Sequence, residues 1–341
     1  MKVFHHPIHV AHEPDFFLVR GIPTASADQP ERVDRLLAGV ARVGLGVEQP
    51  PDFGTEPVAA VHTARYLDFL RDAHREWMTL LGPKAGEVVA NIHPSRDPVG
   101  YPSGVVGRAG WHMADTACPI GPDTHRAALA SANSAVSAAA AVAGGDRFAY
   151  GLCRPSGHHA FADMAGGFCF LNNAAIAAQW LRDHFDRVAM LDIDVHHGNG
   201  TQDIFYRRSD VLTISIHRDP TDYYPFFWGY GDQAGVDDGE GCNLNLPLAE
   251  GSGDPEFLSA VDVARERIRA FGAGVVVIAL GLDAAEDDPL QGLRVTTPGF
   301  ARIGRAIAEL DVPTVFVQEG GYLCDALTDN LASFLTGVMS V

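Results

Sequence analysis

The stretch 188–200 reads Val-Ala-Met-Leu-Asp-Ile-Asp-Val-His-His-Gly-Asn-Gly. An aliphatic run that passes into carboxylates and imidazoles is typical of a strand buried on both faces of a parallel sheet, because ligands bind at the carboxyl ends of such strands. Residues two apart in a strand share a face, so we expect Asp192, Asp194 and His196 to point the same way. These side chains could bind a divalent cation, or they could form a solvated polar cluster. Burying two aspartates without a cation would be costly, which favours the metal site.

Further aliphatic runs alternate with helix-like stretches from about residue 126 onward. The runs cover 148–153, 211–216, 275–280 and 314–317, and the helix-like stretches cover 127–142, 173–184, 255–271 and 298–310. This alternation predicts an α/β fold with a parallel sheet between layers of helices. Polar residues again follow the runs directly: the pair His158-His159, then Asp283, then Tyr322.

Asp283 is the natural third metal ligand because it ends another buried strand, although an aspartate in this place is more often a helix cap. Two carboxylates, one imidazole and an open position would make a catalytic rather than a structural zinc site.

The pair His158-His159 could act as metal ligands or as general acid and base, or it could be ordinary surface histidines. A group that orients an imidazole would favour catalysis, and we expect Asp192 to orient His158 and Asn199 to contact His159. Tyr322 could donate its phenol to a polarised carbonyl, or it could be a packed aromatic residue.

The composition excludes several classes of protein. Of 341 residues 47% are hydrophobic, and 25 Lys and Arg stand against 43 Asp and Glu, a formal net charge of −18. A disordered or fibrous chain is excluded, and nucleic acid is an unfavourable partner for so acidic a protein. The charge suits a cationic substrate, or simply solubility.

The cellular setting follows from cysteines and hydropathy. The five cysteines lie far apart without a Cys-x-x-Cys pair, which favours a reducing cytoplasm. No apolar run approaches the roughly 20 residues that cross a bilayer, and the amino terminus does not read as a signal peptide. We therefore expect a cytoplasmic protein with no membrane partner.

The first 125 residues are less regular. Segments 12–30 and 83–122 are rich in proline, glycine and polar residues and predict long surface loops or insertions, whereas 31–43 and 63–81 predict helices. No repeat or interdomain linker is evident. We expect residues 1–341 to form a single domain.

Three motifs, in this order, resemble the zinc-dependent histone deacetylase superfamily. They are Arg-Pro-Ser-Gly-His-His at 154–159, Asp-Ile-Asp-Val-His-His-Gly-Asn-Gly-Thr-Gln at 192–202 and Glu-Gly-Gly-Tyr at 319–322. Segment 217–231, the loop 12–30 and the chain length look more like the bacterial acetylpolyamine amidohydrolases than the eukaryotic deacetylases. The resemblance covers the whole chain and implies an arginase–deacetylase fold, with an eight-stranded parallel sheet flanked by helices.

The resemblance also implies roles for single residues. It assigns one Zn²⁺ to Asp194, His196 and Asp283, the paired-histidine roles to His158 and His159, and the electrophilic role to Tyr322.

The substrate channel implied by the resemblance is lined by Phe168 and Tyr224, with Gly167 beside them and Asp115 as an acidic rim group. It further implies a structural potassium ion near Asp192, Asp194, His196 and Ser215. In the polyamine branch the loop insertions build a homodimer that narrows the entrance to the cleft.

Departures from the family pattern bear on specificity. Ser156 replaces the second proline of the first motif, and Ala284 follows Asp283 where threonine is common. Phe17 falls where the polyamine branch has an acidic residue for the distal ammonium of the substrate, with Glu13 and Asp15 nearby. The preferred amine therefore stays open.

The hypothesis is metal-assisted hydrolysis of an N-acetyl amide to acetate and a free amine, in which His159, alone or with His158, moves protons and Tyr322 holds the oxyanion. The expected substrate is a small cationic acetylated amine, above all an acetylpolyamine, and the alternative is an acetyl-lysine side chain of a protein. A silent binding protein would lack a ligand or the tyrosine. A binuclear manganese ureohydrolase would need ligands that 195–197 do not supply. The ligand set tolerates zinc, iron or cobalt.

Overall fold

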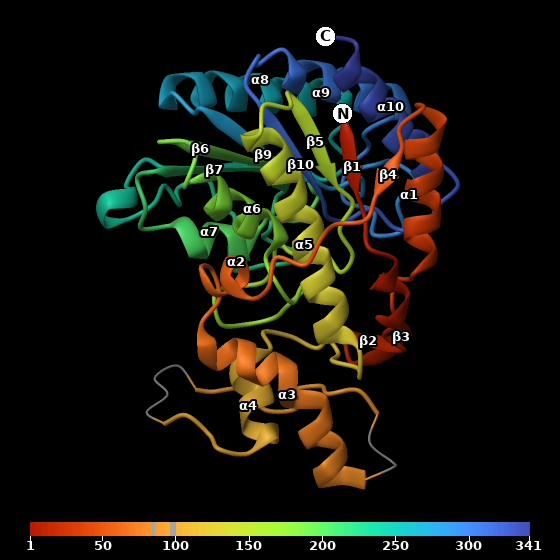
Figure 1. The fold of residues 1–341 in the computed structure, drawn as a ribbon, viewed down its shortest axis with the longest axis vertical. Coiled ribbons are helices and arrows are strands. Elements are labelled where there is room, and N and C mark those ends of the chain that lie inside the picture. The colour runs from red at the N-terminus through yellow and green to blue at the C-terminus, as the bar shows by residue number, and fades with distance from the viewer. Residues whose placement is uncertain (83–85, 96–99) are drawn as a thin grey trace.

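A computed structural model describes residues 1–82, 86–95 and 100–341 (Figure 1). An all-parallel sheet of eight strands lies at its centre, in the order β4-β1-β5-β10-β9-β6-β7-β8. The strands are β1 (Lys2–Phe4), β4 (Val47–Glu48), β5 (Phe148–Gly151), β6 (Val188–Asp192), β7 (Val211–Arg218), β8 (Asn243–Leu248), β9 (Val275–Leu280) and β10 (Thr314–Gln318). The predicted eight-stranded parallel sheet is confirmed.

Helices cover both faces of the sheet, each with its own hydrophobic core. One core joins the sheet to α1 (Glu31–Arg42), α8 (Asp254–Phe271), α9 (Thr297–Ala308) and α10 (Leu327–Met339). The other joins it to α5 (Thr124–Ala143), α6 (Asn173–Leu181) and α7 (Asn199–Phe205). Because both faces are covered, strands such as β9 (Val-Val-Val-Ile-Ala-Leu) are buried along their whole length.

The aliphatic runs predict five of the eight strands, and the other three have weaker signals. The strands β1 and β4 are only three and two residues long. The edge strand β8 alternates buried asparagines with half-buried leucines, so it lacks the continuous apolar run of a central strand.

The helices α2 (Glu56–Ala59) and α3 (Ala64–Leu81) also precede α5, and short 3₁₀ turns cover Pro7–Ala11 and Asp237–Gly239. No helix among the described residues is long and apolar enough to cross a membrane.

Segments 12–30 and 83–122, predicted as long surface loops or insertions, are not loops throughout. The first segment contains an antiparallel hairpin, β2 (Phe16–Val19) and β3 (Ile22–Ala25). The second contains α4 (Val105–His112), which packs with α3 in a third apolar core, while 83–85 and 96–99 lie outside the described residues. Apolar residues spaced among glycines and prolines concealed both elements from the sequence pattern.

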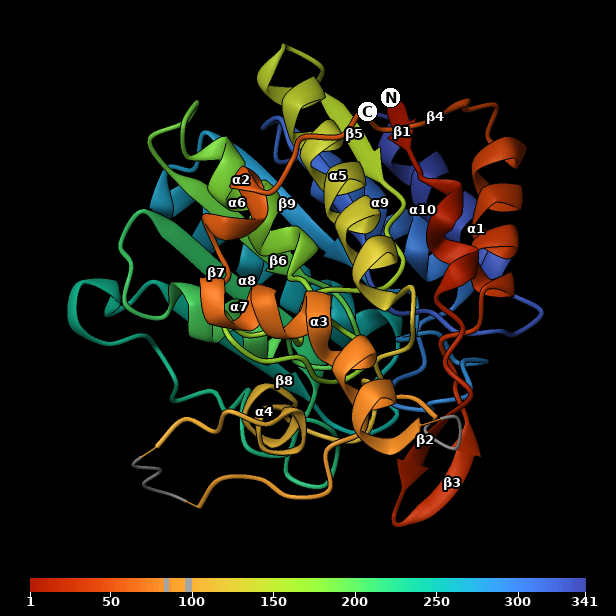
Figure 2. The ribbon, with the colours of Figure 1, turned by 60° about the horizontal axis from the view of Figure 1, so that its bottom comes forward.

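The elements within segments 12–30 and 83–122 lie at one end of the molecule. Figures 1 and 2 both place α3, α4 and the β2–β3 hairpin at the same end, opposite the chain termini. The strands β1 and β5 run toward this end in Figure 1, and the strands of the eight-stranded sheet are parallel, so the carboxyl ends of that sheet face the same end.

Candidate metal centre and active site

Four neighbouring strand ends supply the site. The strands β5, β10, β9 and β6 are adjacent in the sheet, so the segments that follow them meet at one edge. They carry, in that order, the histidine pair, Tyr322, Asp283 and the aspartates with His196. Residues up to 164 positions apart in the sequence thereby become neighbours.

Asp194, His196 and Asp283 form a buried cluster whose ligand atoms all lie within 4.8 Å of one another. The Nδ1 atom of His196 is 3.1 Å from Oδ1 of Asp194 and 3.3 Å from Oδ2 of Asp283. The backbone fixes the carboxylates, since Val195 N–H donates to Oδ1 of Asp283 and Gly320 N–H donates to Oδ2 of Asp194.

One detail of the predicted geometry is wrong. The strand β6 ends at Asp192, so Asp192, Asp194 and His196 do not share one extended face. The chain turns instead, with Asp194 N–H bonded to Oδ1 of Asp192 and His196 N–H bonded to Oδ1 of Asp194. The turn sends Asp192 toward His158 and leaves Asp194 and His196 facing Asp283.

The cluster fits a divalent cation. Oδ2 of Asp283 is buried and accepts no hydrogen bond from the described residues. Burial, with Asp194 nearby, raises the pKa of Asp283 to about 6. Two carboxylates held together at this depth are costly unless a positive charge compensates them. Carboxylate oxygens and an imidazole nitrogen are ligands that Zn²⁺ and related ions accept.

The paired histidines have different partners and opposite ionisation. Nδ1 of His158 lies 2.9 Å from Oδ2 of Asp192, and Nδ1 of His159 lies 2.7 Å from Oδ1 of Asn199. Burial opposes the charged form of His158, but Asp194 and Asp192 outweigh it and raise the pKa of His158 well above its usual range. Burial, with the neighbouring His158 and His196, lowers the pKa of His159 well below its usual range. His159 is therefore neutral, and donating its Nδ1–H to Asn199 leaves Nε2 free to take a proton.

Tyr322 is buried beside the cluster, with 5% of its surface exposed. Burial raises the pKa of its phenol well above the usual range, so the hydroxyl keeps its proton and can donate it. The guanidinium of Arg32 lies 4.6 Å from the centre of the ring, and Tyr322 N–H donates to Oδ2 of Asp288 over 2.8 Å.

Aromatic rings pack beside the paired histidines and Tyr322. The ring of Phe168 lies 5.9 Å from that of Tyr322, and the ring of Tyr224 lies 4.9 Å from that of His159. Phe17, from the β2–β3 hairpin, packs edge-on against Phe168 at 5.2 Å. The hairpin thus brings an apolar side chain against Phe168, whereas Glu13 and Asp15 are exposed.

Asp115 is hydrogen-bonded to Tyr224 and to Gly167. The Tyr224 hydroxyl donates to its Oδ2 over 2.6 Å, and the N–H of Gly167 donates to that oxygen over 3.1 Å. The carboxylate therefore lies beside the predicted channel residues and is half-buried rather than free at the rim.

Ser215 pairs with Asp192 in the register of β6 and β7. The Nε2–H of His217 donates to Gly229 O, so its Nδ1 is the acceptor for the Ser215 hydroxyl, 2.8 Å away. The lone pairs of the Ser215 oxygen stay available beside Asp192, which suits a cation; the potassium ion itself stays a prediction.

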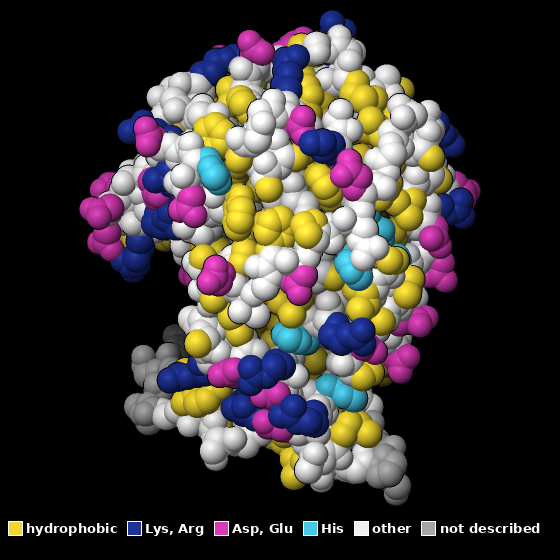
Figure 3. All heavy atoms as spheres, in the orientation of Figure 1, with side chains coloured by type: hydrophobic (Ala, Val, Ile, Leu, Met, Phe, Trp, Pro, Cys, Tyr) yellow, Lys and Arg dark blue, Asp and Glu magenta, His cyan; other side chains and the backbone are white. Residues whose placement is uncertain are grey.

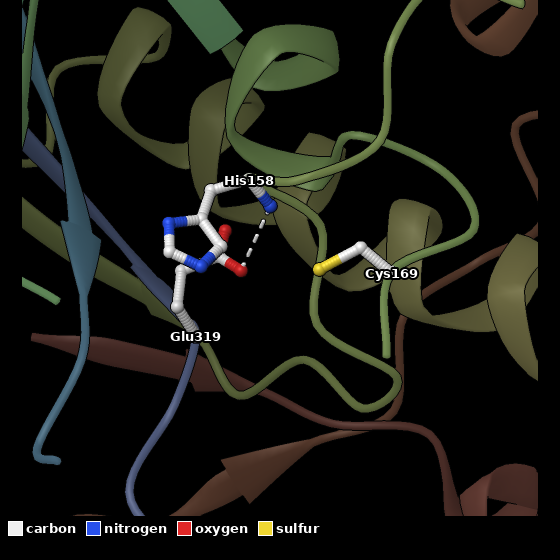
Figure 4. Close-up of side chains that lie close together, drawn as sticks. All are labelled: His158, Cys169 and Glu319. Carbon is white, nitrogen blue, oxygen red and sulfur yellow. Dashed lines mark hydrogen bonds between the residues drawn. The ribbon is translucent and has the colours of Figure 1, made fainter. Parts of the chain in front are cut away.

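Glu319 is a buried residue to which sequence reasoning gave no role. Its Oε2 accepts the N–H groups of Gly157 and His158 at 2.6 and 3.1 Å, and burial raises its pKa to about 8. Figure 4 shows its carboxyl beside His158 and facing Cys169. Burial keeps Cys169 a thiol by raising its pKa, so this second group suits a metal poorly. The available signal was an acidic residue placed directly after a buried strand.

The comparisons with known proteins agree with one another. Residues 26–338 match the family described as histone deacetylase domain. Over 99% of its length the chain is 48% identical to 98% of an acetylpolyamine amidohydrolase from Burkholderia pseudomallei, and over 94% it is 45% identical to 93% of acetylpolyamine amidohydrolase 1 from Pseudomonas aeruginosa. A crystal structure of an acetylpolyamine aminohydrolase from B. pseudomallei superposes with a TM-score of 0.96, at 47% identity, covering 99% of this chain and 98% of that one.

Proposed function

Because the chain belongs to the histone deacetylase family, we propose that it is a metal-dependent amidohydrolase that removes acetyl groups from N-acetylated polyamines. The products are acetate and a free amine. The observation that carries this proposal is the meeting, in one buried site, of the ligand cluster Asp194–His196–Asp283 with the neutral His159 and the phenol of Tyr322.

The residues divide the chemistry among them. A divalent cation held by Asp194, His196 and Asp283 supplies Lewis-acid polarisation of the acetyl carbonyl and lowers the pKa of an attacking water. Nε2 of His159 takes the proton of that water, while Asn199 holds the other ring nitrogen. The hydroxyl of Tyr322 donates to the oxygen that becomes negative.

The leaving amine needs a proton because an amide nitrogen cannot depart as an anion. His159 returns the proton it has taken. Burial, with the charged His158 that Asp192 holds beside it, keeps the pKa of His159 low. Asp192 and Asn199 thus act by orienting the two imidazoles.

An acetylpolyamine is the preferred substrate class. The names of the relatives support it, as does the net charge of −18, which attracts a cation. Phe168 and Tyr224 would flank the acetylated end, with Gly167 and Asp115 beside them. Acetyl-lysine in a protein stays the alternative.

Finer features belong to the same proposal. We propose Zn²⁺ as the native metal, with one ion per subunit, and a structural K⁺ near Asp192, Asp194, His196 and Ser215. We also propose that the protein forms a homodimer through the insertions and acts in the cytoplasm. The resemblance of the motifs supports these features.

Steady-state kcat/KM for acetylputrescine, acetylcadaverine, acetylspermidine and an acetyl-lysine peptide tests the substrate class. We expect at least one acetylpolyamine to exceed the peptide by about tenfold or more, with activity lost on chelation and restored by Zn²⁺. A peptide hydrolysed faster than every acetylpolyamine would favour the alternative, and undiminished activity after complete metal removal would refute the mechanism.

A further inference from the structure

Asp288 is a buried carboxylate that the mechanism above does not use. It lies five residues after Asp283, in the segment that follows β9, and only 1% of its surface is exposed. We infer that Asp288 is a positioning residue that fixes Tyr322 for its hydrogen bond to the substrate oxygen. This inference rests on the proposed function.

The carboxylate joins two of the segments that build the site. Its Oδ2 accepts the N–H of Tyr322 over 2.8 Å, and its Oδ1 accepts the N–H of Leu290 over 2.9 Å. The first bond crosses to the segment after β10, and the second anchors the side chain within its own turn. One side chain therefore ties the segment that carries Tyr322 to the segment that carries Asp283.

Tyr322 needs such a tie because Gly320 and Gly321 precede it. Gly321 has a φ of 115°, a backbone conformation that other residues rarely adopt. A glycine pair offers many alternative conformations, so the position of the next residue must be set by contacts. Two other contacts help: Arg32 Nε donates to Gly321 O over 2.6 Å, and its guanidinium covers the ring.

The phenol oxygen itself makes no hydrogen bond to any of the residues that the structure describes, so the backbone and the ring must locate it. Misplacing a reacting group by about 1 Å can cost on the order of 10² in rate. A bond to the backbone N–H of Tyr322 acts at the base of the side chain, where a small shift moves the hydroxyl furthest.

Asp288→Asn is the direct test, with Asp287→Asn as the matched control. Asparagine keeps the size of the side chain but only one acceptor oxygen, so one of the two N–H groups loses its partner. Asp287 is the exposed neighbour. We expect Asp288→Asn to lower kcat by about 10- to 100-fold with KM and metal affinity within about twofold of the parent, and Asp287→Asn to change neither.

A double-mutant cycle with Tyr322→Phe shows whether Asp288 acts through the hydroxyl. Without the hydroxyl there is nothing left to position, so Asp288→Asn should lower kcat no further in the Tyr322→Phe background. An equal loss in both backgrounds, weakened metal binding, or an unchanged kcat in the single variant would overturn the inference. An undiminished kcat for Tyr322→Phe alone would instead refute the role of the tyrosine in the proposed function.

Amide hydrogen exchange provides a test that does not depend on catalysis. The Tyr322 N–H should exchange slowly in the unmodified enzyme and faster in Asp288→Asn, while Asp287→Asn leaves it unchanged. Rapid exchange at Tyr322 in the unmodified enzyme would contradict the inference even if Asp288→Asn did not fold.

Discussion

At the scale of single residues, the buried acids of the site differ in charge because their partners differ. Asp194 faces the His158 and His196 imidazoles, which together outweigh burial and lower its pKa. Glu319 has two backbone N–H donors and a buried Oε1 that accepts no hydrogen bond from the described residues, so burial dominates and its pKa rises to about 8. Glu319 is therefore mostly protonated near neutral pH.

This protonation makes stability depend on pH. The pKa of Glu319 rises from 4.5 to about 8 in the folded protein, so the unfolded chain loses its proton first as the pH rises from about 4.5 to 8, and folding becomes less favourable over that window. Glutamine mimics the neutral acid at every pH. The parent should therefore lose stability from pH 5 to pH 8.5, whereas Glu319→Gln should not. The difference in free energy of unfolding between variant and parent should shift in favour of the variant by on the order of 1–3 kcal/mol over this range, measured by urea denaturation.

The exposed Glu286→Gln is the control for this measurement. Its unfolding free energy should run parallel to that of the parent at both pH values. If the Glu319→Gln and parent curves also ran parallel, Glu319 would be ionised in the folded protein and the assignment of a neutral acid would be wrong.

The sequence pattern predicts partners that lie near the site residues in the sequence better than partners that come from other segments. Asp192 and Asn199 lie in the same motif as His196, and the structure does place them against the two histidines. Asp288 and Glu319 bond to backbone N–H groups of other segments, and an acceptor for a backbone group leaves no trace in residue type or spacing. Such partners become visible only when the fold brings the segments together.

At the scale of elements, the segment after β10 passes so close to the segments after β6 and β9 that only glycine fits at position 320. A Cβ atom on Gly320 would lie 2.1 Å from Oδ2 of Asp283 and 2.6 Å from Oδ2 of Asp194. The absence of a side chain there lets the backbone N–H reach Asp194.

Gly320→Ala should therefore weaken metal binding by about tenfold or more, because the added methyl displaces one of the two carboxylates. Gly46→Ala is the control, since Gly46 precedes β4 with no heavy atom near its Cβ position. Competition with a chelating dye measures both affinities. Equal affinities for the two variants would mean that the segment relaxes without moving the ligands.

The strength of the strand signals follows burial. The central strands β6, β9 and β10 are buried throughout, so their sequences are continuous apolar runs that can be recognised. Within the described part of the chain, the peripheral β4 pairs with β1 alone and is exposed at both residues. Its position depends on pairing with its neighbour rather than on its own composition. The sequence pattern does not contain this pairing, so it cannot predict β4.

At the scale of the whole molecule, the expected arginase–deacetylase fold is confirmed by the structural similarity, and the added elements lie at the end that carries the site. The core among α3, α4 and α5 includes Phe170, which follows Phe168 and Cys169 in the chain. The β2–β3 hairpin packs Phe17 against Phe168. The parallel sheet thus supplies the residues of the site, and the added elements pack beside them.

Charge acts at the same scale. Figure 3 shows charges of both signs interspersed on one face, yet the chain as a whole carries −18. A cationic substrate is drawn to such a protein over a distance set by the Debye length, which is about 30 Å at 0.01 M salt and about 8 Å at 0.15 M. Raising sodium chloride across this range should therefore lower kcat/KM for an acetylpolyamine several-fold. An acetylated neutral alkylamine of equal length should change little, with potassium held constant so that no potassium site is perturbed. Equal salt dependence for the two substrates would show that net charge has no part in selecting the polyamine, and would leave selection to the walls around Phe168, Tyr224 and Asp115.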